Sequence, residues 1–182
     1  MVLARYIGAP IQDFLLELLE GKMDLALNKE KTRIVDLRES GASLDFLGYT
    51  FRFDKSSKGR SSYLNLFPSK KALARRRAEV KALTRRRSRG TLPSVVCELN
   101  RALLSWGRYF CLGYPSSAFS DLDDYTRMRL GRFAETRSQR PMKRPQGLSH
   151  YAWTRALGLL RLADPRVIAY LRGQGDLPQA YR

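Results

Sequence analysis

The first part of the chain combines one helical pattern with patterns typical of strands. Apolar side chains recur at helical spacing over residues 10–21, which predicts a short helix that Gly21 ends. Three later apolar runs predict strands at 31–37, 45–53 and 61–67. The last two are expected to pair as a β-hairpin, because a short Gly-containing loop separates them.

From Ser69 onward the apolar spacing is that of helices. Ser69 is expected to cap a basic helix over residues 69–89. The narrow apolar stripe of this helix consists of Leu73, Val80 and Leu83. Residues 90–93 contain Gly and Pro, so they are predicted to break it.

The next helix is predicted to begin with Ser94 as its cap. An apolar residue every three or four positions gives it one buried face, formed by Val95, Leu99, Leu103, Trp106 and Phe110. Further helices are expected from Ser116 or Ser117, over 149–162 and over 165–172. The pattern therefore predicts an α+β fold, in which a small helix-plus-hairpin piece precedes a mostly α-helical part.

The charge is strongly positive and unevenly distributed. Lys and Arg number 34 against 17 acidic residues, a net charge of +17. Residues 1–68 hold 10 basic and 9 acidic side chains, whereas residues 69–182 hold 24 and 8. With 43% hydrophobic residues the chain can bury a core, so it is not a disordered polycation. Such a segment favours a polyanionic partner, and nucleic acid is a commoner one than an anionic membrane surface.

Other classes of site find little support in the sequence. The two cysteines, Cys97 and Cys111, fit no paired metal-ligand spacing and suggest a reducing compartment, the cytoplasm. His150 is the only histidine, and no Ser-His-Asp set that uses it is apparent in the sequence. A zinc site is not expected either, because pairs of His and Cys are missing. Neither a signal peptide nor a membrane-spanning run is predicted. No cofactor is expected.

The basic residues of the helical part are the candidate RNA-binding groups. Two arginine runs lie ten residues apart, which would place them on one side of a single helix. Glu79 is the only acid among the ten bases of residues 69–89, so ion pairing cannot account for them. The expected phosphate contacts are Lys70, Lys71, Arg75, Arg76, Arg77, Lys81, Arg85, Arg86, Arg87, Arg101, Arg108, Arg127 and Arg129.

Aromatic and acidic residues were weighed against ordinary structural roles. Trp106 and Phe110 continue the apolar stripe, which favours core packing. Tyr109 lies off that stripe beside Arg108, and it is a candidate for stacking on an unpaired base. Asp123 and Asp124 precede a tyrosine and are interpreted as a solvated turn near the start of a helix.

Five segments occur in an order that resembles a known family. They are LNKEKTRIVDL (27–37), DFLGYTF (45–51), YLNLFPSKKA (63–72), ELNRALLSWGRYFCLG (98–113) and FSDLDDYTRMRL (119–130). Together they resemble the C-terminal half of a group II intron-encoded reverse transcriptase-maturase. The resemblance implies structured RNA, in particular group II intron RNA, as the partner.

The resemblance also implies a division of the chain. It implies the end of a palm domain with a primer-grip-like hairpin at 1–68, the start of the thumb at 69–92, a maturase-specific (X) domain at 93–140, and a linker with a helical tail at 141–182. The primer-grip-like residues are Phe46, Leu47, Gly48 and Tyr49.

One motif of the resembled family is missing from the sequence. Its polymerases hold two metal ions with a Tyr-x-Asp-Asp turn and a further aspartate, and no Tyr-x-Asp-Asp occurs here. The resemblance therefore implies a truncated or split member that binds RNA without polymerase activity, and Mg²⁺ is expected only for the full-length family. Two alternatives remain: a subunit that needs a separate fingers-palm chain, and a non-specific basic nucleic-acid binder.

Overall fold

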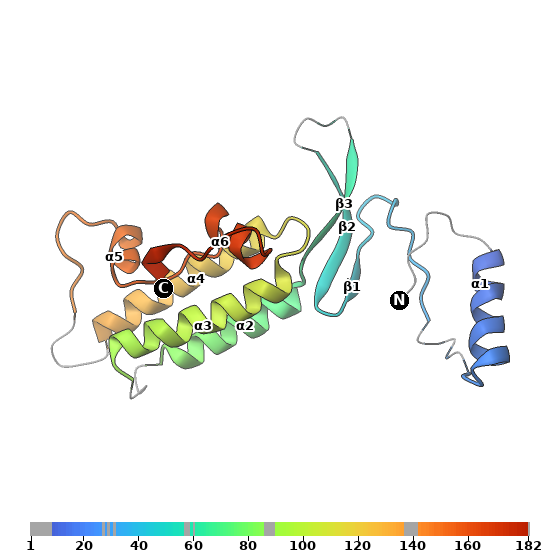
Figure 1. Cartoon of the computed structure of the whole chain (residues 1–182), viewed down its shortest axis with the longest axis horizontal. Coiled ribbons are helices and arrows are strands. Elements are labelled where there is room, and N and C mark those ends of the chain that lie inside the picture. The colour runs from blue at the N-terminus through green and yellow to red at the C-terminus, as the bar shows by residue number, and fades with distance from the viewer. Residues whose placement is uncertain are drawn as a thin grey trace. The chain divides into compact units, whose positions relative to one another are not determined.

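The structure, a computed structural model, divides into two compact units. It describes residues 9–26, 28, 30, 32–56, 59, 61–85, 90–136 and 142–181. The N-terminal unit contains the described residues of 1–46 and 51–64. The C-terminal unit contains those of 47–50 and 65–182. The expected α+β class is confirmed, with a small sheet followed by helices (Figure 1).

The N-terminal unit begins with a helix that has little core. Helix α1 (Ala9–Leu16) continues into a π-helical turn, η1 (Glu17–Lys22), and neither contains a buried residue. The helix expected at 10–21 is thus confirmed in place. The strand expected at 31–37 is wrong, because its described residues 32–37 form none. No described strand lies beside them, and an unpaired strand would leave its backbone groups without partners.

The sheet has three strands in the order β1-β2-β3. They are β1 (Leu44–Phe46), β2 (Tyr49–Lys55) and β3 (Ser62–Pro68). The single strand expected at 45–53 is therefore wrong. Leu47 and Gly48 have φ angles of 50° and 81°, as a two-residue hairpin turn requires, and they divide this segment into two strands.

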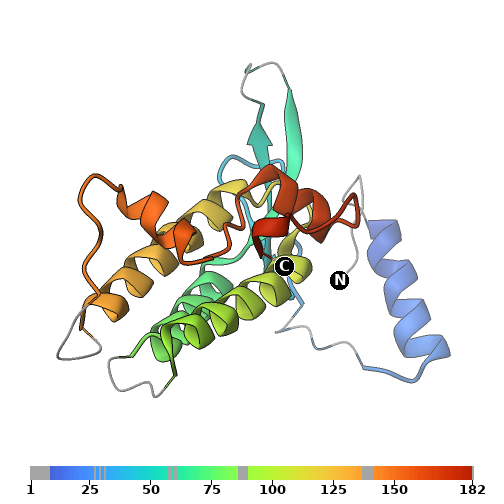
Figure 2. The same cartoon turned by 60° about the vertical axis from the view of Figure 1, so that its left-hand side comes forward.

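The C-terminal unit is built on three long helices that succeed one another in opposite directions (Figures 1 and 2). These are α2 (Lys70–Leu83), α3 (Leu92–Phe110) and α4 (Ser116–Thr136). Helix α2 contacts both α3 and α4. Two short helices, α5 (His150–Ala156) on α4 and α6 (Pro165–Leu171) on α3, and a 3-10 turn, η2 (Gln179–Tyr181), complete the unit.

Three helix ends differ from the sequence expectation, and one of them is the end of α5, at Ala156 rather than at residue 162. Ser69 does cap α2, since its Oγ accepts a hydrogen bond from the Ala72 N–H at 3.2 Å. Helix α2 ends at Leu83 rather than at residue 89. Directly after this end, the Thr84 hydroxyl donates to the Val80 carbonyl at 2.7 Å. Helix α3 begins at Leu92 with Thr91, not Ser94, as its cap, because a proline is tolerated in the first helical turn.

The apolar stripe predicted on α3 forms the core of this unit. Val95, Leu99, Leu103, Trp106 and Phe110 are all buried. The Trp106 ring lies 4.8 Å from the Phe110 ring and 5.7 Å from that of Phe119 on α4, measured between centroids. Trp106 is therefore a packing residue that joins α3 to α4.

Candidate nucleic-acid interface

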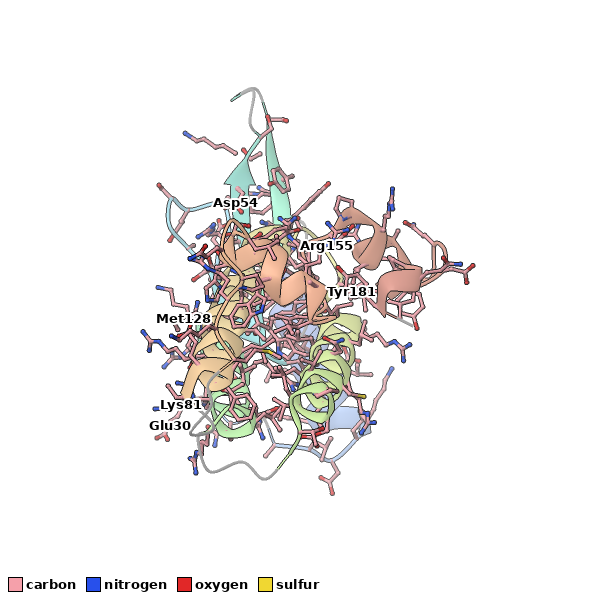
Figure 3. The ribbon with its side chains drawn as sticks, turned by 90° about the vertical axis from the view of Figure 1, so that its left-hand side faces the viewer. Glu30, Asp54, Lys81, Met128, Arg155 and Tyr181 are labelled. Atoms are coloured by element: carbon pink, nitrogen blue, oxygen red, sulfur yellow. The ribbon has the colours of Figure 1, made fainter. Side chains whose placement is uncertain are left out.

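The outward side of α2 carries cations without acidic partners. Lys70, Lys71, Arg75 and Lys81 are exposed, and none forms an ion pair with a described residue. At 3.6 residues per turn they lie within about 140° of one another around the helix axis. The exposed alanines between them are Ala74, Ala78 and Ala82. We call these four cations the outer face of α2; Lys81 is labelled in Figure 3.

Two further candidates are exposed without an ion pair to a described residue: Arg85, just after α2, and Arg101 on α3. The expectation that the two arginine runs share one side of a helix is wrong, because α2 ends before Arg85. Arg86 and Arg87 lie outside the described residues. Their predicted contacts with RNA stay predictions.

The other two arginines of the first run are engaged within the unit. Arg76 donates from Nη1 to the Glu79 carboxylate at 2.7 Å, and its side chain is only 16% exposed. Arg77 lies with its guanidinium carbon 5.5 Å from the centre of the Tyr125 ring on α4. Both side chains thus have neighbours in the protein, which weakens their case as phosphate contacts.

Arg129 on α4 caps the C-terminus of α2. Its Nε donates to the Thr84 hydroxyl at 3.1 Å, and its Nη2 donates to the Thr84 carbonyl at 3.0 Å. A cation at this position satisfies a carbonyl that the helix leaves unpaired, and it opposes the negative end of the helix dipole. Arg129 therefore holds α2 against α4, a structural role that the sequence alone did not indicate.

Arg108 and Arg127 are also committed to neighbours. Arg108 donates to the Tyr170 hydroxyl at 2.6 Å. Arg127 pairs with Asp124 at 2.7 Å and lies 5.7 Å from the centre of the Tyr151 ring. The thirteen predicted phosphate contacts therefore fall into six exposed cations, five engaged arginines and two residues outside the described part.

The primer-grip-like turn is tied to the ends of α2 and α3. The Gly48 carbonyl accepts from the Ser69 N–H at 2.7 Å, and the Leu47 carbonyl accepts from the Tyr109 hydroxyl at 2.9 Å. Gly48 lies so close to Phe110 that a Cβ there would be 3.3 Å from the ring. Glycine thus fits both the turn conformation and this close approach.

The aromatic residues beside this turn divide into buried and exposed ones. Tyr49 is buried, donates its hydroxyl to the Tyr109 carbonyl, and has its pKa raised to about 12 by that burial. Tyr109 is 51% exposed, and Leu47 is 68% exposed. Phe46 is also exposed. Tyr109 therefore has open ring surface, as stacking on a base requires, although its hydroxyl is engaged.

Asp123 differs from its interpretation as part of a solvated turn. It lies in the middle of α4, is buried, and accepts from the N–H groups of Leu162 and Ala163, both at 2.9 Å. Burial raises its pKa from 3.8 to about 7. Asp123 lies at helical spacing from the buried residues Phe119, Leu122, Thr126 and Leu130. This spacing in the sequence could have indicated that Asp123 is buried. Asp124 is exposed.

Two other kinds of site were sought over the described residues. No three His, Cys, Asp or Glu side chains among them gather in a way that could hold a metal ion. No helix of this described part is both long and apolar enough to span a membrane.

The decisive comparison concerns the helices that carry these cations. Residues 73–152 match the family model described as "Group II intron, maturase-specific domain", which covers most of α2, all of α3 and α4, and the start of α5. This stretch is similar to the maturase-specific domain of group II introns. The resemblance to the C-terminal region of a group II intron reverse transcriptase-maturase is thereby confirmed, and the domain supports a maturase-type function. No curated protein matches the chain.

Proposed function

We propose that the chain binds group II intron RNA through the outer face of α2 and assists splicing by stabilising the folded RNA. The observation that carries the proposal is the set of exposed cations without acidic partners on a helix of the maturase-specific domain. Such cations repel one another unless an anion neutralises them. The chain performs no chemistry in this proposal, because the intron RNA supplies the reacting groups.

The shape of this face suits a phosphate backbone. Arg75 can pair two phosphate oxygens with its planar guanidinium, and the lysines act as compact point charges. The exposed alanines leave space between the cations, so the RNA backbone can approach the helix closely. Arg85 and Arg101 are two further exposed cations in the same unit.

Phosphate contacts give affinity but carry no sequence information. Discrimination between intron and other RNA must therefore come from shape and from unpaired bases. Tyr109 offers one exposed ring for such a base at the end of α3.

The test is a titration of the full chain against intron RNA and a structured control transcript of equal length, at four salt concentrations. Tighter binding of the intron RNA, with an affinity that falls as salt rises, is expected. Splicing is then followed at a Mg²⁺ concentration too low for the RNA alone, where the chain should raise the spliced fraction. Equal affinity for both RNAs, or unchanged splicing, would contradict the proposal.

A further inference from the structure

A small pocket lies in the C-terminal unit between α4, α5 and the residues that follow α5. Its volume is about 130 Å³, and its walls include Arg127 of α4, Tyr151 and Arg155 of α5, and Arg161 and Tyr181 beyond them. Arg155 and Tyr181 are both labelled in Figure 3. None of these residues except Arg127 belongs to the predicted phosphate contacts, so the pocket is distinct from the outer face of α2.

The Tyr151 ring lines this pocket, and two guanidinium groups lie over it. The guanidinium carbons of Arg127 and Arg161 lie 5.7 and 5.6 Å from the centre of the Tyr151 ring. Arg161 also approaches the Tyr151 hydroxyl, with Nη1 at 3.4 Å. The Tyr151 side chain is nevertheless 38% exposed, so part of it is open to a ligand.

The acidic residues of the pocket do not neutralise all of its cations. Asp124 pairs with Arg127 at 2.7 Å. Asp123 has both carboxylate oxygens occupied by backbone N–H groups. Arg155 and Arg161 are exposed and form no ion pair with any described residue, so two positive charges remain for an anionic ligand.

The size and the chemistry of the walls restrict the ligand. Pockets for drug-sized molecules measure roughly 300–1,000 Å³, so this one admits little more than a single planar ring. A free phosphate would use the cations and the tyrosine hydroxyls, but it would leave the two aromatic rings unused. An unpaired nucleotide uses both, because its base packs on an aromatic ring or a guanidinium plane while its phosphate pairs with arginine.

We propose that this pocket receives one unpaired nucleotide of the bound RNA, with its base against Tyr151 and its phosphate on Arg155 and Arg161. The inference rests on the proposed binding of RNA. It adds a site that recognises an extruded base to the proposed phosphate contacts of α2.

The experiment compares three RNA hairpins: one fully paired, one with a single-nucleotide bulge, and one whose bulge is abasic. The wild-type chain should bind the bulged hairpin on the order of tenfold more tightly than the paired one, as expected for one base stacked on an aromatic ring. The abasic bulge keeps the phosphate and loses the base, so it should bind more weakly than the intact bulge.

Variants then assign this preference to the pocket. Tyr151→Ala should abolish the preference while keeping the affinity for the paired hairpin, and Tyr151→Phe should retain it. Arg155→Gln with Arg161→Gln should weaken the binding of the bulged hairpin only. Thermal melting checks that each variant is folded, and should Tyr151→Ala unfold, the variant with Arg155→Gln and Arg161→Gln still decides, because both of these side chains are exposed.

Two outcomes separate the two proposals. Equal binding of the paired and bulged hairpins by the wild-type chain overturns the nucleotide pocket and leaves the proposed RNA binding standing. Absence of binding to every hairpin overturns both. A preference for the bulge that persists in Tyr151→Ala also overturns the assignment to this pocket.

Discussion

Arginine has different roles on the outer face of α2 and on the inward sides of α3 and α4. On the outer face, four exposed cations form no ion pair with any residue that the structure describes: Lys70, Lys71, Arg75 and Lys81. On the inward sides, Arg129 caps α2 and Trp106 joins α3 to α4. Charge counted along the sequence therefore overstates the surface available to RNA, since some arginines hold helices together. Substitutions should separate the two regions: inward ones should cost stability, and outward ones should change binding.

The largest effect is expected at Trp106. Trp106→Ala should lower the free energy of unfolding by about 3–5 kcal/mol, because it leaves a cavity between α3 and α4. Chemical denaturation measures this loss, with Ser105→Ala at an exposed position of α3 as the control. A variant that unfolds like the parent but binds RNA more weakly would make Trp106 a binding residue instead.

The buried carboxyl of Asp123 should make stability depend on pH. Its folded pKa of about 7 lies above its ordinary value of 3.8, so the folded state favours the protonated form. Deprotonation of Asp123 therefore lowers the free energy of unfolding. This loss is absent below about pH 4, grows as the pH rises, and is complete above about pH 7. Between these two pH values the free energy of unfolding falls by roughly 4 kcal/mol.

The pH effect is isolated by comparing unfolding of the parent, Asp123→Asn and Asp124→Asn from pH 4 to pH 8. The parent and Asp124→Asn should lose stability over this range by an amount that Asp123→Asn does not lose. Parallel curves for all three proteins would show that Asp123 titrates at its ordinary pKa.

Arg129 separates a capping arginine from a binding one. Arg129→Gln should reduce the free energy of unfolding by about 2 kcal/mol, because it removes charged hydrogen bonds to the end of α2. The slope of log affinity for RNA against log salt should stay unchanged. Arg132→Gln, an exposed arginine on the same helix, is the control and should leave stability within about 0.5 kcal/mol of the parent. A smaller salt slope in Arg129→Gln would place this side chain on RNA.

Arg75 should show the opposite behaviour at smaller scale. Arg75→Gln removes one phosphate contact, so the salt slope should fall by about 0.7 for single-stranded RNA. Its stability should remain within about 0.5 kcal/mol of the parent, because the side chain is exposed. Affinities at four salt concentrations measure the slope, and an unchanged slope would mean that Arg75 faces solvent in the complex.

The elements that follow local rules could be predicted from the sequence. The α3 stripe, the Ser69 cap and the start of α4 depend on spacing and on a single capping side chain, and all three are confirmed. The turn at Leu47 and Gly48 was missed because Leu47 adopts a positive φ that its residue type disfavours.

The contact partners of individual side chains could not be predicted in the same way. Arg129 and Thr84 are 45 positions apart, and Asp123 and Leu162 are 39 apart, so only the packed helices bring them together. A sequence pattern shows that a helix is basic. Which of its arginines remain free depends on the neighbours that tertiary packing supplies.

The most direct test of the account replaces the whole outer face of α2. The quadruple variant changes Lys70, Lys71, Arg75 and Lys81 to Gln, and its matched control makes the same change at the exposed residues Arg132, Lys143, Arg144 and Arg166. Affinities for intron and control RNA are measured at four salt concentrations. We expect the slope to fall by about 3 in the quadruple variant and by much less in its control. An unchanged slope in the quadruple variant would contradict RNA binding by the outer face of α2. A reduced slope in the control would assign the phosphate contacts to the control residues instead.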